Sequence, residues 1–313
     1  HNRLHKRFWY YGLSMALGFG ILTKGVVMLA VTGPVFVIWL TFTQNWKNLL
    51  PLYLTTGIAL FLAIVVPWHY LAYKANPDFL NKYFYVEHFL RYTTSVHGRY
   101  KPFWFFIPFI VLGVMPWTFV VIKGAQKGLQ KYKPLTLYLA LWALWTVGFY
   151  SVGNSKLIPY ILPALIPAAG LVGIGLNDLI ATKQNHWSLT VGSGMFVFLG
   201  LTGLLGHLFF SDLLTDCADI MPYVKMGAIL FLGFGIGAVI CKAFEWRLIF
   251  LFGCSISLIF LMTLIAPSIQ KTSVKPFAEI INAEKRVGDA IVSFDSYFQD
   301  LPVYTQTAPI ICV

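Results

Sequence analysis

The stretch RLIFLFGCSISLIFLMTLIA, residues 247–266, decides the fold class. After its first residue it contains no charged side chain, and about 20 apolar residues in a helix are enough to cross a bilayer. Backbone amides in hydrocarbon must be hydrogen bonded within their own segment, so a crossing stretch is expected to be helical. We therefore predict a chain that spans a membrane as helices.

The rest of the chain has the same apolar character. Of its 313 residues, 58% are hydrophobic and only 11% are charged, whereas a soluble domain carries about 25% charged residues. The sequence predicts an α-helical polytopic membrane protein with about nine transmembrane helices. The predicted spans are residues 8–22, 26–42, 49–68, 103–122, 135–153, 157–179, 188–210, 225–242 and 247–266.

The composition changes after residue 266, because residues 267–313 hold five of the twelve acidic side chains. The segment DAIVSFDSYFQDLPVYT, residues 289–305, is typical of a strand, a turn and the start of a second strand. We predict that residues 1–266 form an N-terminally incomplete transmembrane region. Residues 267–313 would then begin a small extracytoplasmic α/β domain that is cut short.

Lys and Arg residues are scattered between the apolar runs, although the formal net charge is +11. This distribution fits membrane flanks better than a nucleic-acid groove, so no nucleic-acid partner is expected. If the N-terminus is cytoplasmic, the inside loops hold most of these cations. The outside loop 69–102 breaks this bias with five positive charges.

Most of this loop's polar residues lie in the segment YFYVEHFLRYTTSVHGRYKPFW, residues 83–104. Asn76 and Pro77 are a helix start signal, so a short helix on the outer membrane surface is predicted. At α-helical spacing Glu87 pairs with Arg91, while His88, Arg91 and Tyr92 share a face. An apolar stripe is predicted on another face, formed by Phe79, Leu80, Tyr83, Phe84 and Leu90. The segment could be an interfacial helix with an aromatic belt, or it could be a site for an anion such as phosphate.

Two further outside turns favour the anion site. The turn in GILTKGVV carries Lys24, and the turn in GNSKLIPYILPALIP carries Lys156, followed by Tyr160. A lone outside Lys is usually a membrane anchor. Cations from three connections on one face, against the charge rule, favour a shared role instead.

The order of these motifs carries a family resemblance. LTKG, NPDFLNKYFYVEHFLRY…HGRYKPFWFF, PW and SKLIPYILPALIP resemble glycosyltransferase family 39, whose members are type C membrane glycosyltransferases. Within it they resemble the bacterial lipid A 4-amino-4-deoxy-L-arabinose transferases, over about residues 12–170. The resemblance implies transfer of a sugar from a polyprenyl-phosphate donor to a lipid or protein acceptor. The site would lie on the extracytoplasmic side of the bacterial inner membrane.

The resemblance also implies roles for individual residues. Phosphate binding falls on Lys24, Arg91, Tyr160 and Lys156, with Glu87, Tyr92, His97 and Arg99 in support. A divalent metal ion near this loop would use His88, for which a structural hydrogen bond is the alternative. The catalytic carboxylate of the family is expected upstream of His1, so no catalytic residue is assigned within the chain.

Three other functions share some of these features. A transporter or flippase of an anionic lipid would also place cations outside, but it should carry ionisable residues within its spans. A lipid-linked polysaccharide ligase or polymerase would share the chemistry with different Arg spacing. A structural subunit would interact with membrane lipids and would need no clustered cations.

Overall fold

A computed structural model describes most of the chain, in two compact units. The described residues are 3–46, 53–94, 101–184, 186–209, 220–269, 274–286, 288–293, 298, 300–306 and 311–312. The first unit consists of His1–Phe198 and Gly233–Ser255. The second consists of Leu199–Leu232 and Ile256–Val313.

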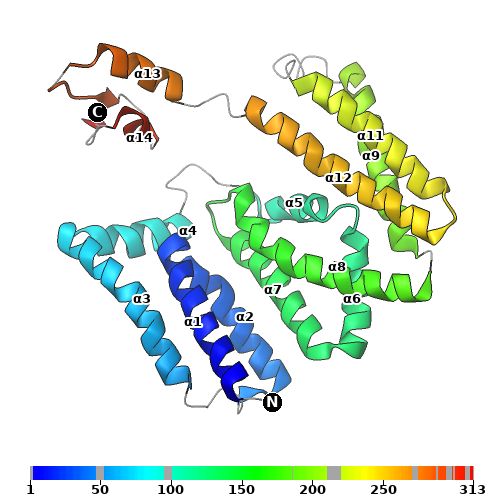
Figure 1. The fold of residues 1–313 in the computed structure, drawn as a ribbon, viewed down its shortest axis with the longest axis horizontal. Helices are drawn as coiled ribbons and strands as arrows, with labels where there is room; N and C mark the ends of the chain where they lie inside the picture. Colours follow the sequence, from blue (N-terminus) through cyan, green and yellow to red (C-terminus); the bar gives the residue numbers. More distant parts are fainter. Residues whose placement is uncertain are drawn as a thin grey trace. The chain divides into compact units, whose positions relative to one another are not determined.

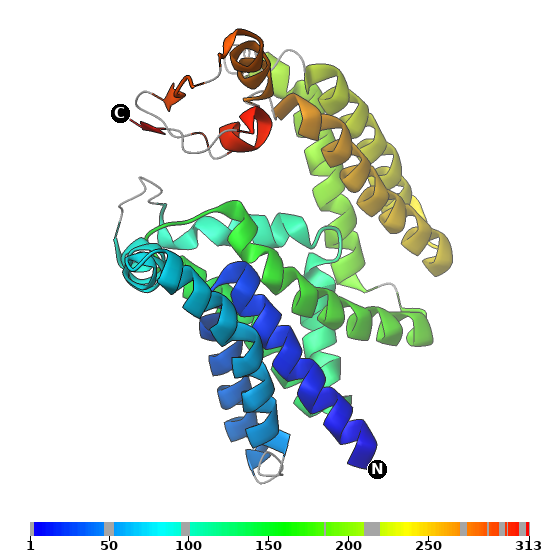
Figure 2. The ribbon, with the colours of Figure 1, turned by 60° about the vertical axis from the view of Figure 1, so that its left-hand side comes forward.

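The first unit begins with three helices that lie side by side, α1 (Arg3–Lys24), α2 (Val27–Thr43) and α3 (Tyr53–Ala75) (Figure 1 and Figure 2). The helix α1 packs against both of the others. Tryptophan side chains join α2 to a later helix, α7 (Lys133–Val152), because the Nε1 of Trp145 donates to the carbonyl of Ala30 at 3.0 Å. A second such bond runs from Trp39 to the carbonyl of Pro134 at 2.7 Å.

A π-helix follows α3, where the sequence predicts a short surface helix. It is η2 (Asn81–Leu90), and it continues into one turn of α-helix, α4 (Arg91–Thr93). The backbone amide of Asp78 donates to the side chain of Asn76 at 3.1 Å, which confirms Asn76 as part of the helix start. The winding differs from the prediction, which assumed α-helical spacing.

The predicted span 103–122 is wrong as a single helix. The chain forms η3 (Phe103–Phe105) and α5 (Phe106–Gly113), then turns and forms α6 (Thr118–Lys131). The two helical parts meet at 89°. Pro116 lies between them, and proline interrupts a helix because it has no amide hydrogen and clashes with the preceding turn.

Two helices complete the core of the first unit, α7 and α8 (Leu162–Thr182), which is preceded by η4 (Ile158–Ile161). The helix α8 packs against α6 and α7. Val120, Val172 and Leu179 are buried in the apolar cluster between α6 and α8. These helices approach closely because Gly124 has no side chain where it meets the backbone carbonyl of Leu171.

Three long helices, α9 (Trp187–Phe209), α11 (Met221–Ile240) and α12 (Phe244–Ile269), each contribute residues to both units. Among the described residues, six helices are long and apolar enough to cross a membrane, or seven with the bent pair α5–α6. The chain is thus an integral membrane protein. The predicted count of nine spans is not confirmed, although each predicted span other than 103–122 overlaps one helix.

The last part of the second unit contains α13 (Lys275–Glu284), β1 (Val292–Ser293), α14 (Leu301–Thr305) and β2 (Ile311–Cys312). The strands β1 and β2 pair in parallel, with Val292 opposite Ile311. The sequence wrongly predicts a second strand at residues 301–305, which are helical with Pro302 in the first turn. Proline favours that position because its φ suits a helix start. The domain boundary after residue 266 and its extracytoplasmic side stay predictions.

The substitution Gly124→Ala tests the close approach of α6 and α8. A Cβ there would overlap the carbonyl oxygen of Leu171, so the helices must separate, at a cost of about 1–3 kcal/mol. We expect a lower Tm in detergent by several degrees. Gly173→Ala in α8 is the control, since its Cβ would meet nothing within 4 Å; an equal Tm for both variants would contradict this packing.

Candidate functional site

The π-helical winding of η2 sets the direction of the polar side chains. In a π-helix, backbone hydrogen bonds join residues five apart. The Nδ1 of His88 lies 2.5 Å from the carbonyl oxygen of Tyr83, five residues earlier. His88 therefore has the structural hydrogen bond that one reading of the sequence expects, and its Nε2 is turned toward the α1–α2 connection.

Arg91 joins two of the predicted outside connections. Its Nη2 donates to the hydroxyl of Tyr160 at 3.1 Å, and its Nη1 pairs with Oε2 of Glu87 at 3.2 Å. The predicted Glu87–Arg91 pair is confirmed. The Nε of Arg91 is buried and has no hydrogen-bond partner among the residues that the structure describes.

The α1–α2 connection reaches the same helix through a glycine. Gly25 has φ +77°, and a Cβ at this position would overlap the Nε2 of His88. A backbone with positive φ and no room for a side chain requires glycine. Lys24 precedes this glycine and is exposed. The turn that carries Lys24 thus lies against the helix that leads to Arg91.

Tyr92 anchors this arrangement to the end of α7. Its hydroxyl donates to the carbonyl of Phe149 at 2.9 Å, and the two rings stack with centroids 4.9 Å apart. Burial raises the pKa of Tyr92. The amide of Asn154 donates to the Tyr92 carbonyl at 2.9 Å, so η2 and α4 are fixed to the connection that leads to Tyr160. Tyr92 therefore supports the site by holding its parts together.

Lys156 is buried in the protein, unlike a lysine that anchors a helix at the membrane surface. It is 4% exposed, and its Nζ donates to the carbonyl oxygens of Lys101 at 3.0 Å and Gly153 at 2.6 Å. Burial lowers the pKa of Lys156. These contacts tie the chain before α5 to the end of α7, which is a structural role; phosphate binding by Lys156 stays a prediction.

The remaining predicted site residues have different outcomes. His97 and Arg99 lie outside the described residues. Within the described part of the chain, no group of three or more His, Cys, Asp or Glu side chains could hold a metal ion. His88, Arg91 and Tyr92, for which the sequence predicts a shared face, contact Gly25, Tyr160 and Phe149, respectively. The sequence predicts Tyr83 only as part of the apolar stripe, whereas its hydroxyl faces Gly25.

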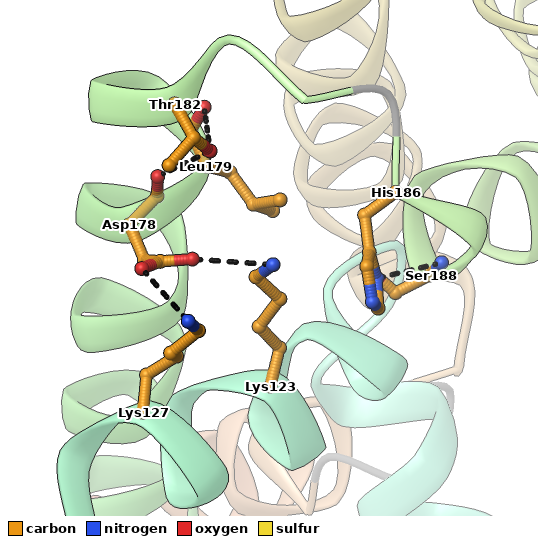
Figure 3. A network of polar contacts seen from close by, with 7 residues as sticks. All are labelled: Lys123, Lys127, Asp178, Leu179, Thr182, His186 and Ser188. Carbon is orange, nitrogen blue, oxygen red and sulfur yellow. Dashed lines mark hydrogen bonds and ion pairs between the residues drawn. The ribbon is translucent and has the colours of Figure 1, made fainter. Parts of the chain in front are cut away.

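A second polar network joins α6 to α8 (Figure 3). The carboxylate of Asp178 receives Lys123 at 3.1 Å and Lys127 at 3.7 Å. Close by, the Nδ1 of His186 bonds the hydroxyl of Ser188 at 2.9 Å. The pKa of His186 is lowered, mainly by burial and also by the charge of Lys123. The charge of Asp178 opposes this shift without reversing it. The sequence predicts these lysines only as charges of a cytoplasmic loop. Asp178 is far from them along the chain, so no local spacing indicates the ion pairs.

Comparisons with known proteins agree with the motifs. Residues 1–83 match the family model described as dolichyl-phosphate-mannose-protein mannosyltransferase. A relative from Enterobacter sp. (strain 638), named undecaprenyl phosphate-alpha-4-amino-4-deoxy-L-arabinose arabinosyl transferase, is 34% identical over 61% of this chain and 35% of its own. The resemblance to glycosyltransferase family 39 is confirmed. A transferase of the same name from Erwinia tasmaniensis is 29% identical over 79% of this chain and 46% of its own length.

Solved structures show the same fold. The chain matches a crystal structure of ArnT from Cupriavidus metallidurans bound to undecaprenyl phosphate, with a TM-score of 0.81 and 24% identity. The match covers all of this chain and 58% of that one. The apo state of the same protein gives a TM-score of 0.79. The chain spans between about a third and a half of the length of the curated relatives it matches.

The substitution Asp178→Asn tests the second network. It leaves the buried ammonium of Lys123 without its counter-charge, and breaking a buried pair in this way costs about 3 kcal/mol. We expect a clear drop in Tm, partly recovered in Lys123→Met/Asp178→Asn. Glu245→Gln is the control, because its pair with Lys183 is exposed and exposed pairs contribute little. Equal Tm values for Asp178→Asn and Glu245→Gln would refute the role of the network.

Proposed function

We propose that this chain is part of a glycosyltransferase that moves a sugar from a polyprenyl-phosphate carrier to a lipid or protein acceptor. The reaction would occur on the extracytoplasmic face of the bacterial inner membrane. The observation that carries the proposal is the hydrogen bond of 3.1 Å between Arg91 and Tyr160, on a helix that also contacts the turn of Lys24. Two of the three connections are thereby joined by a side-chain bond, and the turn that carries Lys24 lies against the helix η2 that precedes Arg91.

The names of the relatives support the class of donor. Those transferases are named for undecaprenyl phosphate and an aminoarabinose, so a polyprenyl phosphate of this kind is the expected carrier here. The family model that matches residues 1–83 is named for dolichyl phosphate mannose. The common chemistry is a sugar joined through its anomeric carbon to the phosphate of a long lipid, and the sugar and acceptor differ between relatives.

The proposed sugar transfer depends mainly on stabilising the negative charge of the leaving phosphate. An acceptor oxygen attacks the anomeric carbon, the bond from that carbon to the carrier phosphate breaks, and a general base removes the acceptor proton. A single displacement inverts the anomeric centre. The carrier phosphate gains negative charge as it leaves, so fixed positive groups beside it lower the barrier. Lys24 and Arg91 supply charge, and the hydroxyl of Tyr160 supplies a donor.

The partial burial of Arg91 strengthens its electrostatic interaction with a phosphate. The Arg91 side chain is only 31% exposed, and ionic interactions weaken less in such partly buried places than in bulk water. The guanidinium is held by Glu87 and Tyr160 before any ligand arrives. A preoriented group needs no reorganisation during the reaction, which is what electrostatic catalysis requires.

Substitution of the two cations in the full-length protein tests the proposal. We expect Arg91→Ala and Lys24→Ala each to lower kcat/KM for sugar transfer by about 100-fold, the effect of removing one charge-stabilising group. The measurement follows radiolabelled sugar from undecaprenyl phosphate to an acceptor lipid. Lys82→Ala is the matched control, because Lys82 is an exposed cation on the same helix η2.

Rates within twofold of wild type for Arg91→Ala and Lys24→Ala would refute these roles. The same assay separates the transferase from a transporter, which would move the labelled lipid across a vesicle membrane without transferring its sugar. Vesicle flux without transfer would favour the transporter.

A further inference from the structure

The phenol of Tyr83 lies beside the proposed phosphate site, and its hydroxyl has no part in the contacts that build this site. Its Oη is buried and has no hydrogen-bond partner among the residues that the structure describes. A buried donor without a partner costs about 1–3 kcal/mol. Native proteins satisfy nearly all such groups, so an exception calls for a functional explanation.

The position of this hydroxyl connects two of the proposed phosphate-binding residues. The Oη lies 3.0 Å from the place that a Cβ on Gly25 would take, and Lys24 is the next residue. Tyr83 also belongs to the helix η2 that leads into Arg91, and its carbonyl bonds the imidazole of His88. The hydroxyl is therefore fixed at the junction of the α1–α2 turn and η2.

The ring of Tyr83 is held on several sides, so its hydroxyl cannot easily turn away. The centroids of His69, Phe79, Phe84 and His88 lie between 4.8 and 5.3 Å from its own. Burial raises the pKa of Tyr83. The phenol thus stays protonated at neutral pH and remains a hydrogen-bond donor.

The other tyrosines of the site already have partners. Tyr92 donates to the carbonyl of Phe149, and Tyr160 receives the guanidinium of Arg91. Among the described residues, the Nε of Arg91 and the Oη of Tyr83 are buried donors without partners, as is the hydroxyl of Ser155 beside Lys156. A phosphate offers several strong acceptor oxygens and can satisfy more than one donor at once.

We propose that the hydroxyl of Tyr83 donates a hydrogen bond to a non-bridging oxygen of the carrier phosphate, beside Lys24 and Arg91. This inference rests on the proposed function and adds a binding residue to the same site. A hydroxyl that binds a ligand can be distinguished by measurement from one that stabilises the protein. Its removal weakens the ligand and leaves the ligand-free protein intact.

The experiment compares Tyr83→Phe with Tyr85→Phe in the full-length protein. Tyr85 lies on the same helix but is 51% exposed, so it is a matched control for the loss of one phenol oxygen. Purified protein is titrated with undecaprenyl phosphate and, separately, with undecaprenol, which lacks the phosphate. The Tm is measured with and without each lipid.

We expect Tyr83→Phe to raise the Kd for undecaprenyl phosphate about tenfold, as the loss of a hydrogen bond to a charged group does. The Kd for undecaprenol should match wild type, and the Tm without lipid should be unchanged or slightly higher. Tyr85→Phe should keep both affinities within twofold of wild type.

Two results would overturn the inference while the proposed function stands. One is a Tyr83→Phe affinity within twofold of wild type when Arg91→Ala has lost affinity. The other is a Tm lowered by several degrees without lipid, together with equal losses for both lipids, which would make the hydroxyl structural. If wild type binds undecaprenol as tightly as undecaprenyl phosphate, the proposed phosphate site itself fails, and the inference fails with it.

Discussion

The contact between the α1–α2 turn and the helix η2 is the constraint on which the candidate site depends. Gly25 adopts a positive φ and leaves the space of a Cβ to the imidazole of His88. Because the imidazole is itself bonded to the carbonyl of Tyr83, it cannot move aside without breaking that bond. The turn and the π-helix therefore fix one another, and Lys24 comes to lie beside the helix that leads to Arg91.

The sequence predicts individual contacts at the candidate site and the positions of most apolar helices, but it does not predict how the helices bend. The Glu87–Arg91 pair followed from a spacing of four, and it forms at 3.2 Å. The contact of Arg91 with Tyr160, 69 residues later, agrees with the prediction that the loop of Arg91 and the turn before Tyr160 lie on the same side of the membrane. Span positions could be predicted because apolar length is a local property of the chain. The bend at Pro116 could not, because the apolar run continues through it.

Other features were missed for physical reasons. The sequence predicts α-helical winding for residues 76–92, but residues 81–90 wind as a π-helix, in which backbone hydrogen bonds join residues five apart. The sequence predicts Tyr83 as part of the apolar stripe because its ring is apolar. The pattern does not predict whether its hydroxyl finds a hydrogen-bond partner. The burial of Lys156 depends on carbonyls of Lys101 and Gly153, which only the fold brings together.

The charges at the site suit a ligand whose own charge increases during the reaction. Glu87 occupies one side of the Arg91 guanidinium, and its negative charge lowers the net positive charge of the site. In the proposed reaction the carrier changes from a phosphodiester to a phosphate monoester and becomes more negative. A site that acts only through net charge would bind this product more tightly than the donor and release it slowly. The neighbouring carboxylate opposes such product binding, while the directed donors still act on the phosphate oxygens as the bond breaks.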